Sequence, residues 1–318
     1  MCSDRNARAA DPADPIHPAK QEVRPTAPKF VAEVSSNHQC DLDRALRFVD
    51  RAADIGCDGV KFQLFRIDEL FAPEILRQSA THRARRSWEL PERFLEPIAD
   101  RCRERGVAFG CTPFYLDAVS ALSPFVDFLK IASYELLWDD LLAACARTGL
   151  PLILSTGMAT LEEVLHAADV IERAGGRDLT LLHCVSGYPA PAAAANLAAI
   201  DSLAAIDARF ENVSIRSGWS DHTVDPGVIF RAAHAHPTDL IEFHLDLEGD
   251  GDEFESGHCW LPHDMQETIA RVQTGFRAEG SAHKAPAEIE SEERSWRADP
   301  ADGLRPLRPL RHTWSPVA

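Results

Sequence analysis

The stretch "DLIEFHLDLEGDG", residues 239–251, joins an apolar run to a cluster of polar groups. The run holds a histidine, His244, near its end, and a loop of acidic residues follows. Short, almost continuously apolar runs are typical of strands buried on both faces of a parallel sheet. The pattern therefore predicts a buried strand that carries His244 at its carboxyl end.

Seven similar runs precede this one, and a segment with helical spacing follows each of the eight. The strand-like runs are residues 30–34, 59–63, 107–111, 126–132, 151–155, 179–184, 213–218 and 239–245. The helical segments are residues 42–55, 92–105, 116–122, 138–148, 160–174, 197–208, 226–235 and 262–277. Eight strand–helix units in about 250 residues predict an α/β protein with a closed (β/α)₈ TIM barrel. An open doubly wound sheet is the alternative, but its Gly-rich phosphate turn is not found in "EVSSNHQCD", residues 33–41.

Composition narrows the class of protein. The chain has 318 residues, 45% of them hydrophobic, and its net charge of −17 argues against nucleic acid as a partner. No apolar run approaches the ~20 residues of a membrane span, and "MCSDRNARAADPADPIHPAK" lacks the apolar core of a signal peptide. Eight scattered cysteines without a Cys-x-x-Cys pair favour reduced thiols and a cytoplasmic location.

Three segments are expected along the chain. Residues 1–28, rich in Ala, Pro and Asp, predict a flexible N-terminal arm. Residues 29–279 form the predicted barrel. Residues 280–318 are charged and interrupted by proline, which predicts an extended C-terminal tail packed along the body.

Polar residues occupy the carboxyl ends of all eight predicted strands, where TIM barrels place their chemistry. A single one has an ordinary explanation as a helix cap or loop residue, but eight such ends together predict a site. The residues are Glu33, Lys61, Gln63, Thr112, Lys130, Ser133, Glu135, Ser155, Ser186, Tyr188, Ser220, Asp221, His222 and His244.

Two lysines sharpen this prediction. Lys61 and Lys130 are the only lysines between residues 30 and 280, and both lie inside apolar runs. A buried lysine is costly unless it meets an anion. Either the two form structural salt bridges, or both point into the mouth of the barrel and bind a phosphate or carboxylate.

The two histidines allow two interpretations. His222 and His244 follow consecutive strands, whose ends lie about 5 Å apart in a barrel. Each could be a core histidine; as a pair they could bind one divalent ion and leave positions open for water or substrate. Without a third protein ligand the pair is closer to a labile Mn²⁺ or Mg²⁺ site than to structural zinc.

The motifs "VAEVSSNHQCDLDRAL", "GCDGVKFQLF", "CTPF", "LKIASYEL", "PLILSTGMATLEEV", "LLHCVSGYPAP" and "WSDHT" resemble the N-acetylneuraminate (sialic acid) synthase family, in its order and over residues 30 to about 278. The resemblance implies a TIM barrel that condenses phosphoenolpyruvate with an N-acetylhexosamine such as N-acetylmannosamine. The products would be a nine-carbon 2-keto sugar acid and phosphate. It also implies a divalent cation, Mn²⁺ or Mg²⁺, and makes a homodimer plausible.

The resemblance also implies roles for residues. His222 and His244 would be metal ligands, Glu33 an acid or base, and Glu135 and Tyr188 would face the sugar. Gln63 and Asp221, at two strand ends, are further candidates for substrate contact. The residues implied at the phosphoenolpyruvate site are Lys61, Thr112, Lys130, Ser133, Ser155, Ser186 and Ser220.

Two departures from the family concern the sugar. The resemblance covers the barrel only, not the family's usual C-terminal antifreeze-like domain. The loop after His244 usually reads close to "GPDHKAS" and here reads "LEGDGDEFESGHCWLP", where Glu255 is predicted to meet sugar hydroxyls, with His258 nearby. A synthase for another 3-deoxy-2-keto sugar acid and a non-catalytic sugar-phosphate-binding barrel are the alternatives.

Overall fold

The structure is a computed structural model that describes residues 26–281 and 283–315. It divides into two compact units, the first ending at Phe276 and the second beginning at Arg277. The predicted N-terminal arm at residues 1–28 lies, up to residue 25, outside the described residues.

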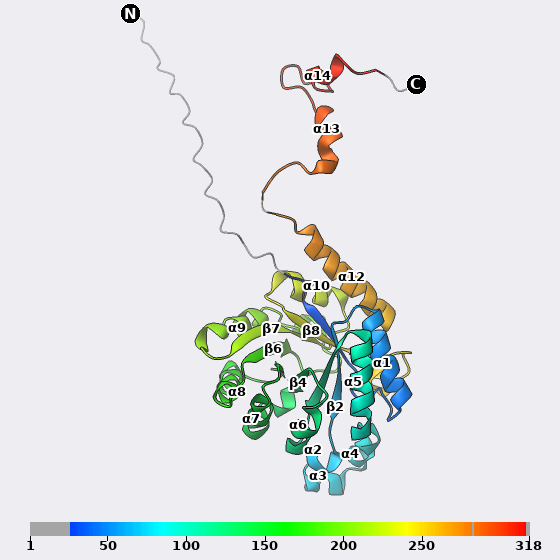
Figure 1. Ribbon diagram of the computed structural model, residues 1–318, viewed down its shortest axis with the longest axis vertical. Coiled ribbons are helices and arrows are strands. Elements are labelled where there is room, and N and C mark those ends of the chain that lie inside the picture. Colours follow the sequence, from blue (N-terminus) through cyan, green and yellow to red (C-terminus); the bar gives the residue numbers. More distant parts are fainter. Residues whose placement is uncertain (1–25, 282, 316–318) are drawn as a thin grey trace, which may run out of the picture. The chain divides into compact units, whose positions relative to one another are not determined.

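Eight parallel strands close into a barrel in sequence order (Figure 1). Each strand pairs with the next, and β1 pairs with β8 to close the ring, with Glu33 opposite His244. This confirms the predicted (β/α)₈ TIM barrel. A short ninth strand pairs with the end of β8. The strands are β1 (Lys29–Glu33), β2 (Gly59–Leu64), β3 (Ala108–Pro113), β4 (Phe128–Ile131), β5 (Leu152–Ser155), β6 (Asp178–Cys184), β7 (Ser214–Asp221), β8 (Leu240–Leu245) and β9 (Cys259–Trp260).

A helix follows each barrel strand where sequence spacing predicted one, and of these only α12 runs beyond its predicted segment, by one residue. These helices are α1 (Leu42–Asp54), α5 (Leu95–Arg105), α6 (Leu116–Leu122), α7 (Asp139–Arg147), α8 (Leu161–Arg173), α9 (Ala199–Ala204), α10 (Pro226–Ala235) and α12 (Pro262–Ala278). The sequence did not predict the short elements in the loops. They are α2 (Ile67–Leu70), α3 (Pro73–Gln78), α4 (Ala80–Ala84), α11 (Asp252–Glu255), and the 3₁₀ turns η1 (Arg85–Trp88), η2 (Glu92–Phe94), η3 (Ser133–Glu135), η4 (Ala192–Ala194) and η5 (Asp207–Arg209).

Local sequence fixes where these helices begin. The Asp41 side chain accepts a hydrogen bond from the Arg44 amide at the start of α1. At α8, Thr160 and Glu163 form a capping box in which each side chain bonds the other's backbone. Such caps satisfy amide groups that have no partner within the helix. At α1 and α8 they hold the strand-to-helix loop at the carboxyl end of the barrel.

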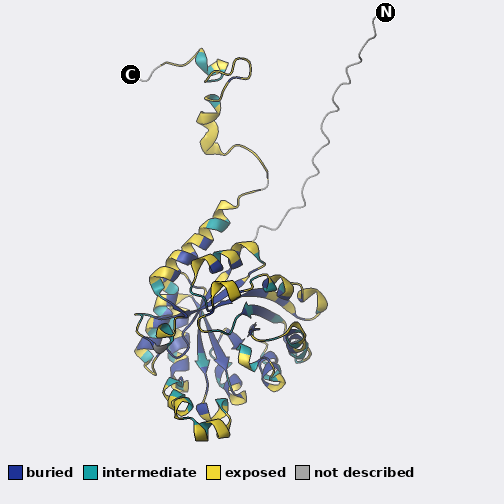
Figure 2. Ribbon diagram, turned by 180° about the vertical axis from the view of Figure 1, so that it is seen from behind, coloured by how far each residue is buried: buried dark blue, intermediate teal, exposed yellow. Residues whose placement is uncertain are grey.

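The alternation of side chains along a strand explains what faces the inside of the barrel. A small apolar cluster fills part of the interior, while the larger core contains residues of both strands and helices, so the strands are buried on both faces (Figure 2). The small cluster consists of Val31, Phe128, Ile153, Leu182 and Leu240. Residues two positions further along a strand face the same side. This places Glu33, Lys130, Ser155 and Glu242 above the apolar cluster, on the inward face.

The second unit contains three short helical elements, η6 (Glu288–Glu290), α13 (Ser291–Ser295) and α14 (Arg308–Arg311). Within it the rings of Trp296 and Trp314 meet edge to face, 6.3 Å apart. Its packing as a tail along the barrel stays a prediction. Among the described residues, no helix is long and apolar enough to cross a membrane, and the seven cysteines described are free.

Candidate active site

The carboxyl end of the barrel holds a buried cluster of lysines and glutamates. Lys130 Nζ lies 3.1 Å from Glu242 Oε1, and Lys61 Nζ lies 3.9 Å from Glu242 Oε2. Lys61 also contacts Glu33. All four side chains are at most 4% exposed. Both lysines therefore point into the barrel mouth, as predicted, and there they also form the salt bridges of the alternative interpretation.

Burial and charge pull the pKa values of this cluster in opposite directions. Burial lowers the pKa of Lys61 to about 7, although the neighbouring Glu242 carboxylate opposes the shift. Burial favours the neutral form of Glu242, but Lys130 and Lys61 outweigh it and hold the pKa of that carboxyl below its ordinary value. The cluster is thus close to charge balance, so an anion that enters must displace a carboxylate from a lysine or bring a cation with it.

Hydroxyl groups surround the lysines. Thr112 Oγ1 accepts from Lys61 at 3.4 Å, and Ser220 Oγ donates to Glu242 at 3.1 Å. Ser133 Oγ accepts from the Gly157 amide at 3.0 Å, while Ser155 Oγ and Ser186 Oγ are buried without a hydrogen-bond partner. Ser155 lines the cavity at the barrel mouth with both lysines, so its unpartnered hydroxyl is available to an anion, whereas Ser186 is not among the lining residues.

Gly157 follows β5 and keeps this corner open. A Cβ atom there would lie 2.8 Å from the Cys184 sulfur and 2.9 Å from Ser133 Oγ, closer than packed atoms tolerate. The absence of a side chain is therefore what allows the loop after β5 to approach the hydroxyl groups of the mouth.

The two predicted histidines meet beside this cluster. β7 and β8 are paired neighbours, and the ring centroids of His222 and His244 are 5.3 Å apart. Burial lowers the pKa of His222 to about 3 and also lowers the pKa of His244. A hydrogen bond of 2.8 Å to the Val185 carbonyl occupies His222 Nδ1 and directs Nε2 elsewhere. Neutral imidazoles held in this way suit a divalent ion, so the pair fits the metal that the sequence predicted.

Two further predicted residues, Gln63 and Tyr188, line the cavity at the barrel mouth, whereas a third, Glu135, does not. Gln63 donates to Glu33 at 2.9 Å. It lines this cavity together with Lys61, Lys130, His222 and His244. The half-exposed Tyr188 lies with its ring 4.3 Å from that of His222. Glu135 is outside the residues that line the cavity, and burial raises its pKa to about 7 despite the charge of Lys130.

Two residues predicted to contact the substrate, Glu255 and Asp221, are not among the residues that line the cavity at the barrel mouth. The carboxylate that reaches His244, at 3.1 Å, belongs to Glu253, whereas Glu255, two residues on, is exposed. Asp221 is fully buried and its oxygens already accept five hydrogen bonds, from the indoles of Trp219 and Trp260, from two groups of Thr223 and from the Val224 amide. A carboxylate so fully bonded is a structural hub rather than a substrate contact.

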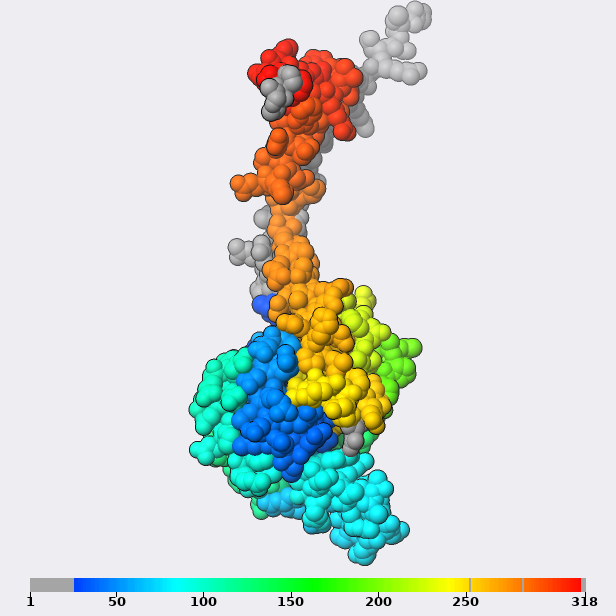
Figure 3. Space-filling view, turned by 90° about the vertical axis from the view of Figure 1, so that its right-hand side faces the viewer, coloured from blue at the N-terminus to red at the C-terminus, as the bar shows by residue number. Residues whose placement is uncertain are grey.

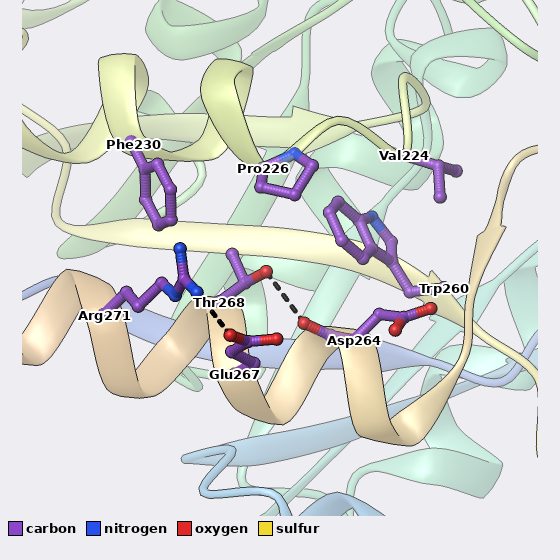
Figure 4. Close-up of a pocket in the computed structure, with 8 residues that line it drawn as sticks. All are labelled: Val224, Pro226, Phe230, Trp260, Asp264, Glu267, Thr268 and Arg271. Carbon is purple, nitrogen blue, oxygen red and sulfur yellow. Dashed lines mark hydrogen bonds and ion pairs between the residues drawn. The ribbon is translucent and has the colours of Figure 1, made fainter.

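Trp260 links this hub to the outside of the barrel. Its indole nitrogen donates to Asp221, while its ring lines an outer pocket between α10 and α12 (Figure 4). In that pocket Arg271 pairs with Glu267, and Thr268 donates to the Asp264 carbonyl. None of the predicted site residues lines it.

Glu242 is the central residue that the sequence analysis missed. It bonds Lys130 and Ser220 and lies near Lys61. Its position carried a signal, because Glu242 lies two residues before His244 and therefore on the same face of β8. A glutamate within an apolar strand that also carries a site histidine predicts a buried partner for the lysines.

Comparison with known proteins identifies the family. The sequence profile of the NeuB family matches residues 48–284, about three quarters of the chain. The chain belongs to the NeuB family. It is 32% identical to the spore coat polysaccharide biosynthesis protein SpsE of Bacillus subtilis, over 87% of this chain and 79% of that protein. It is 30% identical to the N,N'-diacetyllegionaminic acid synthase of Legionella pneumophila, over 82% of this chain and 76% of that one.

A solved structure extends the NeuB likeness to three dimensions. The N-acetylneuraminic acid (sialic acid) synthetase of Leptospira borgpetersenii serovar Hardjo-bovis, crystallised with citrate, superposes with a TM-score of 0.71 and 27% identity. The match covers 84% of this chain and 90% of that one. The resemblance found in the sequence motifs is thereby confirmed.

Proposed function

We propose that the protein condenses phosphoenolpyruvate with an N-acetylhexosamine, giving a 2-keto-3-deoxy nonulosonic acid and phosphate. One observation carries the proposal. Lys61 and Lys130 converge on Glu242 at the carboxyl end of the barrel, beside the His222–His244 pair. Phosphoenolpyruvate bears a carboxylate and a phosphate, and two lysines ringed by hydroxyl groups suit both.

The reaction assigns work to particular groups. Atom C3 of phosphoenolpyruvate forms a bond with the sugar's aldehyde carbon, the aldehyde oxygen takes up a proton, water adds at C2 and the C2–O bond to phosphate breaks. Lys61 and Lys130 would orient the anion, and Glu33, held by Gln63 and Lys61, would move a proton near C2. A divalent cation, Mn²⁺ or Mg²⁺, bound by His222 and His244 would supply Lewis-acid polarisation of the aldehyde.

Phosphate release tests the proposal directly. The full-length protein is incubated with phosphoenolpyruvate, Mn²⁺ and N-acetylmannosamine, and inorganic phosphate and product mass are measured. We expect phosphate and a nine-carbon keto acid in equal amounts, neither of which forms when the sugar is omitted. If phosphoenolpyruvate, Mn²⁺ and any of a panel of aldehyde sugars give no phosphate, a non-catalytic sugar-phosphate-binding barrel becomes the better interpretation.

A second candidate differs only in the sugar. The chain is similar to an N,N'-diacetyllegionaminic acid synthase, and its segment 246–261 departs from the family pattern on the acceptor side. The same assay with a diacetamido hexose and with shorter aldoses separates the two candidates. The sugar with the highest kcat/KM identifies the product class.

A further inference from the structure

The segment 246–261 brings two of its side chains, Glu253 and His258, beside His244. It contains α11 and ends in β9, which pairs with β8 through His244 and Leu245. Arg44 of α1 fixes its start, with hydrogen bonds of 2.6 Å to Glu248 and 3.4 Å to Asp246. Figure 3 shows this segment, in yellow, beside α1, in blue. A loop anchored at both ends positions the side chains between them.

Two of those side chains converge on His244. Glu253 Oε2 lies 3.1 Å from His244 Nδ1 and 3.6 Å from His258 Nε2. The rings of His244 and His258 are 4.8 Å apart. His258 is 5% exposed, and its Nδ1 is buried without a hydrogen-bond partner. A buried imidazole nitrogen without a partner is costly unless a further group binds there.

The serines after β1 orient the carboxylate. Ser35 and Ser36 donate their hydroxyls to Glu253 Oε1, the latter at 2.9 Å, so Oε2 is the oxygen left facing the histidines. Hydrogen bonds of this kind to a carboxylate are what hold a metal ligand in place. Cys259 is also close to His244 and Glu253, but its sulfur lies 3.7 Å from the Asn37 amide, which donates to it.

We propose that His244, Glu253 and His258, whose ligand atoms lie within 4.8 Å of one another, bind one metal ion. His222, whose ring lies 5.3 Å from that of His244, would be the fourth ligand, giving one carboxylate and three imidazoles. The proposal rests on the metal site of the proposed function and extends it with two residues of segment 246–261. Three nitrogen donors favour Mn²⁺, Fe²⁺, Co²⁺ or Zn²⁺ over Mg²⁺, which prefers oxygen ligands and keeps its water. The segment therefore both supplies two ligands and narrows the choice of cation.

Metal affinity tests the proposal without reference to turnover. The full-length protein is stripped with a chelator, and Mn²⁺ binding is measured by calorimetry and by the loss of the free-Mn²⁺ paramagnetic resonance signal. Glu253→Gln and His258→Gln are compared with Glu255→Gln and His263→Gln, exposed neighbours of the same residue types. We expect each of the first two to weaken binding by more than ~100-fold, beyond the 10–100-fold typical of residues that only orient a ligand, and the controls by less than about twofold.

The outcomes separate this inference from the proposed function. Binding by Glu253→Gln and His258→Gln at parental affinity, while His222→Ala and His244→Ala lose the metal, overturns the four-ligand site and leaves the reaction standing. A loss of 10–100-fold in both also overturns it, because the two residues then only orient the histidine pair. Four-ligand binding without phosphate release supports the site and contradicts the reaction. If Glu253→Gln unfolds the protein, Glu253→Asp is measured in its place. In addition, the visible spectrum of bound Co²⁺ is compared between the parent and His258→Gln, and identical spectra contradict the proposal.

Discussion

On one side of the barrel mouth the polar groups stand on the strands, whereas on the other side several stand on a long loop. Lys61, Lys130 and Ser155 belong to β2, β4 and β5. Opposite them, His244 of β8 is joined by Glu253 and His258 from segment 246–261. Strand-borne groups are fixed by the geometry of the closed sheet, while loop-borne groups depend on contacts that the loop itself makes. In the proposed reaction, the groups that would bind phosphoenolpyruvate are therefore fixed by the barrel, whereas two of the proposed metal ligands depend on the loop.

The largest expected effect on turnover is that of replacing His244, which stands on β8 and is contacted by the loop residues Glu253 and His258. His244→Ala should lower kcat by roughly a thousandfold or more, because a Lewis-acid ion supplies several kcal/mol to such a step and each 1.36 kcal/mol is tenfold. Phosphate release measures kcat, and circular dichroism checks the fold. His183→Ala is the control, since His183 bonds the Ala195 carbonyl and does not line the cavity. Activity of His244→Ala within tenfold of the parent would contradict the metal pair.

The next effect tests the lysine side alone. Lys130→Met should raise KM for phosphoenolpyruvate and lower kcat/KM by about 100-fold, since a charge-assisted contact contributes about 1.5–3 kcal/mol. Metal affinity should stay at the parental value, because Lys130 bonds Glu242 and neither histidine. Lys29→Met, an exposed lysine, is the control. Unchanged steady-state kinetics would remove Lys130 from the site.

Lys61 predicts a smaller effect that depends on pH. Burial lowers its pKa to about 7, so the ammonium is present below pH 7 and is lost above it. The affinity of the free protein for phosphoenolpyruvate should therefore fall by up to about tenfold per pH unit above 7, because binding must then return the proton. Calorimetry between pH 6.5 and 8.5 measures the slope. Lys61→Arg stays charged throughout, and an equally steep fall in that variant would exclude Lys61 as the cause.

The same contrast explains what could be predicted from the sequence. The alternation of strands and helices predicted the barrel, and the polar residues at the strand ends predicted Lys61, Lys130 and His244 at its mouth. Glu242, two residues before His244, was missed, and only the structure showed that it joins the lysines. In the loop the sequence offers several acids and no period, so it does not single out Glu253, whose carboxylate reaches His244. Glu253 lies in the short helix α11, and no pattern in the sequence predicted that helix.

Replacing Asp221 should have the smallest effect on catalysis. Asp221 stands at the end of β7, but its hydrogen bonds hold the loop in place. It accepts a hydrogen bond of 2.9 Å from Trp260 of β9 and so ties segment 246–261 to β7. Asp221→Asn replaces one acceptor oxygen by an NH₂ group that faces the N–H and O–H donors around it. This should lower the free energy of unfolding by about 1–3 kcal/mol. We expect kcat/KM for phosphoenolpyruvate to stay within about threefold of the parental value. Steady-state kinetics measure kcat/KM, and chemical denaturation measures the free energy of unfolding. Asp225→Asn, which alters only the exposed N-cap of α10, should lose less. A large fall in kcat/KM at unchanged stability would instead show that Asp221 acts in the substrate site. Asp221 would then belong with the strand residues that bind substrate, and not with the contacts that hold the loop.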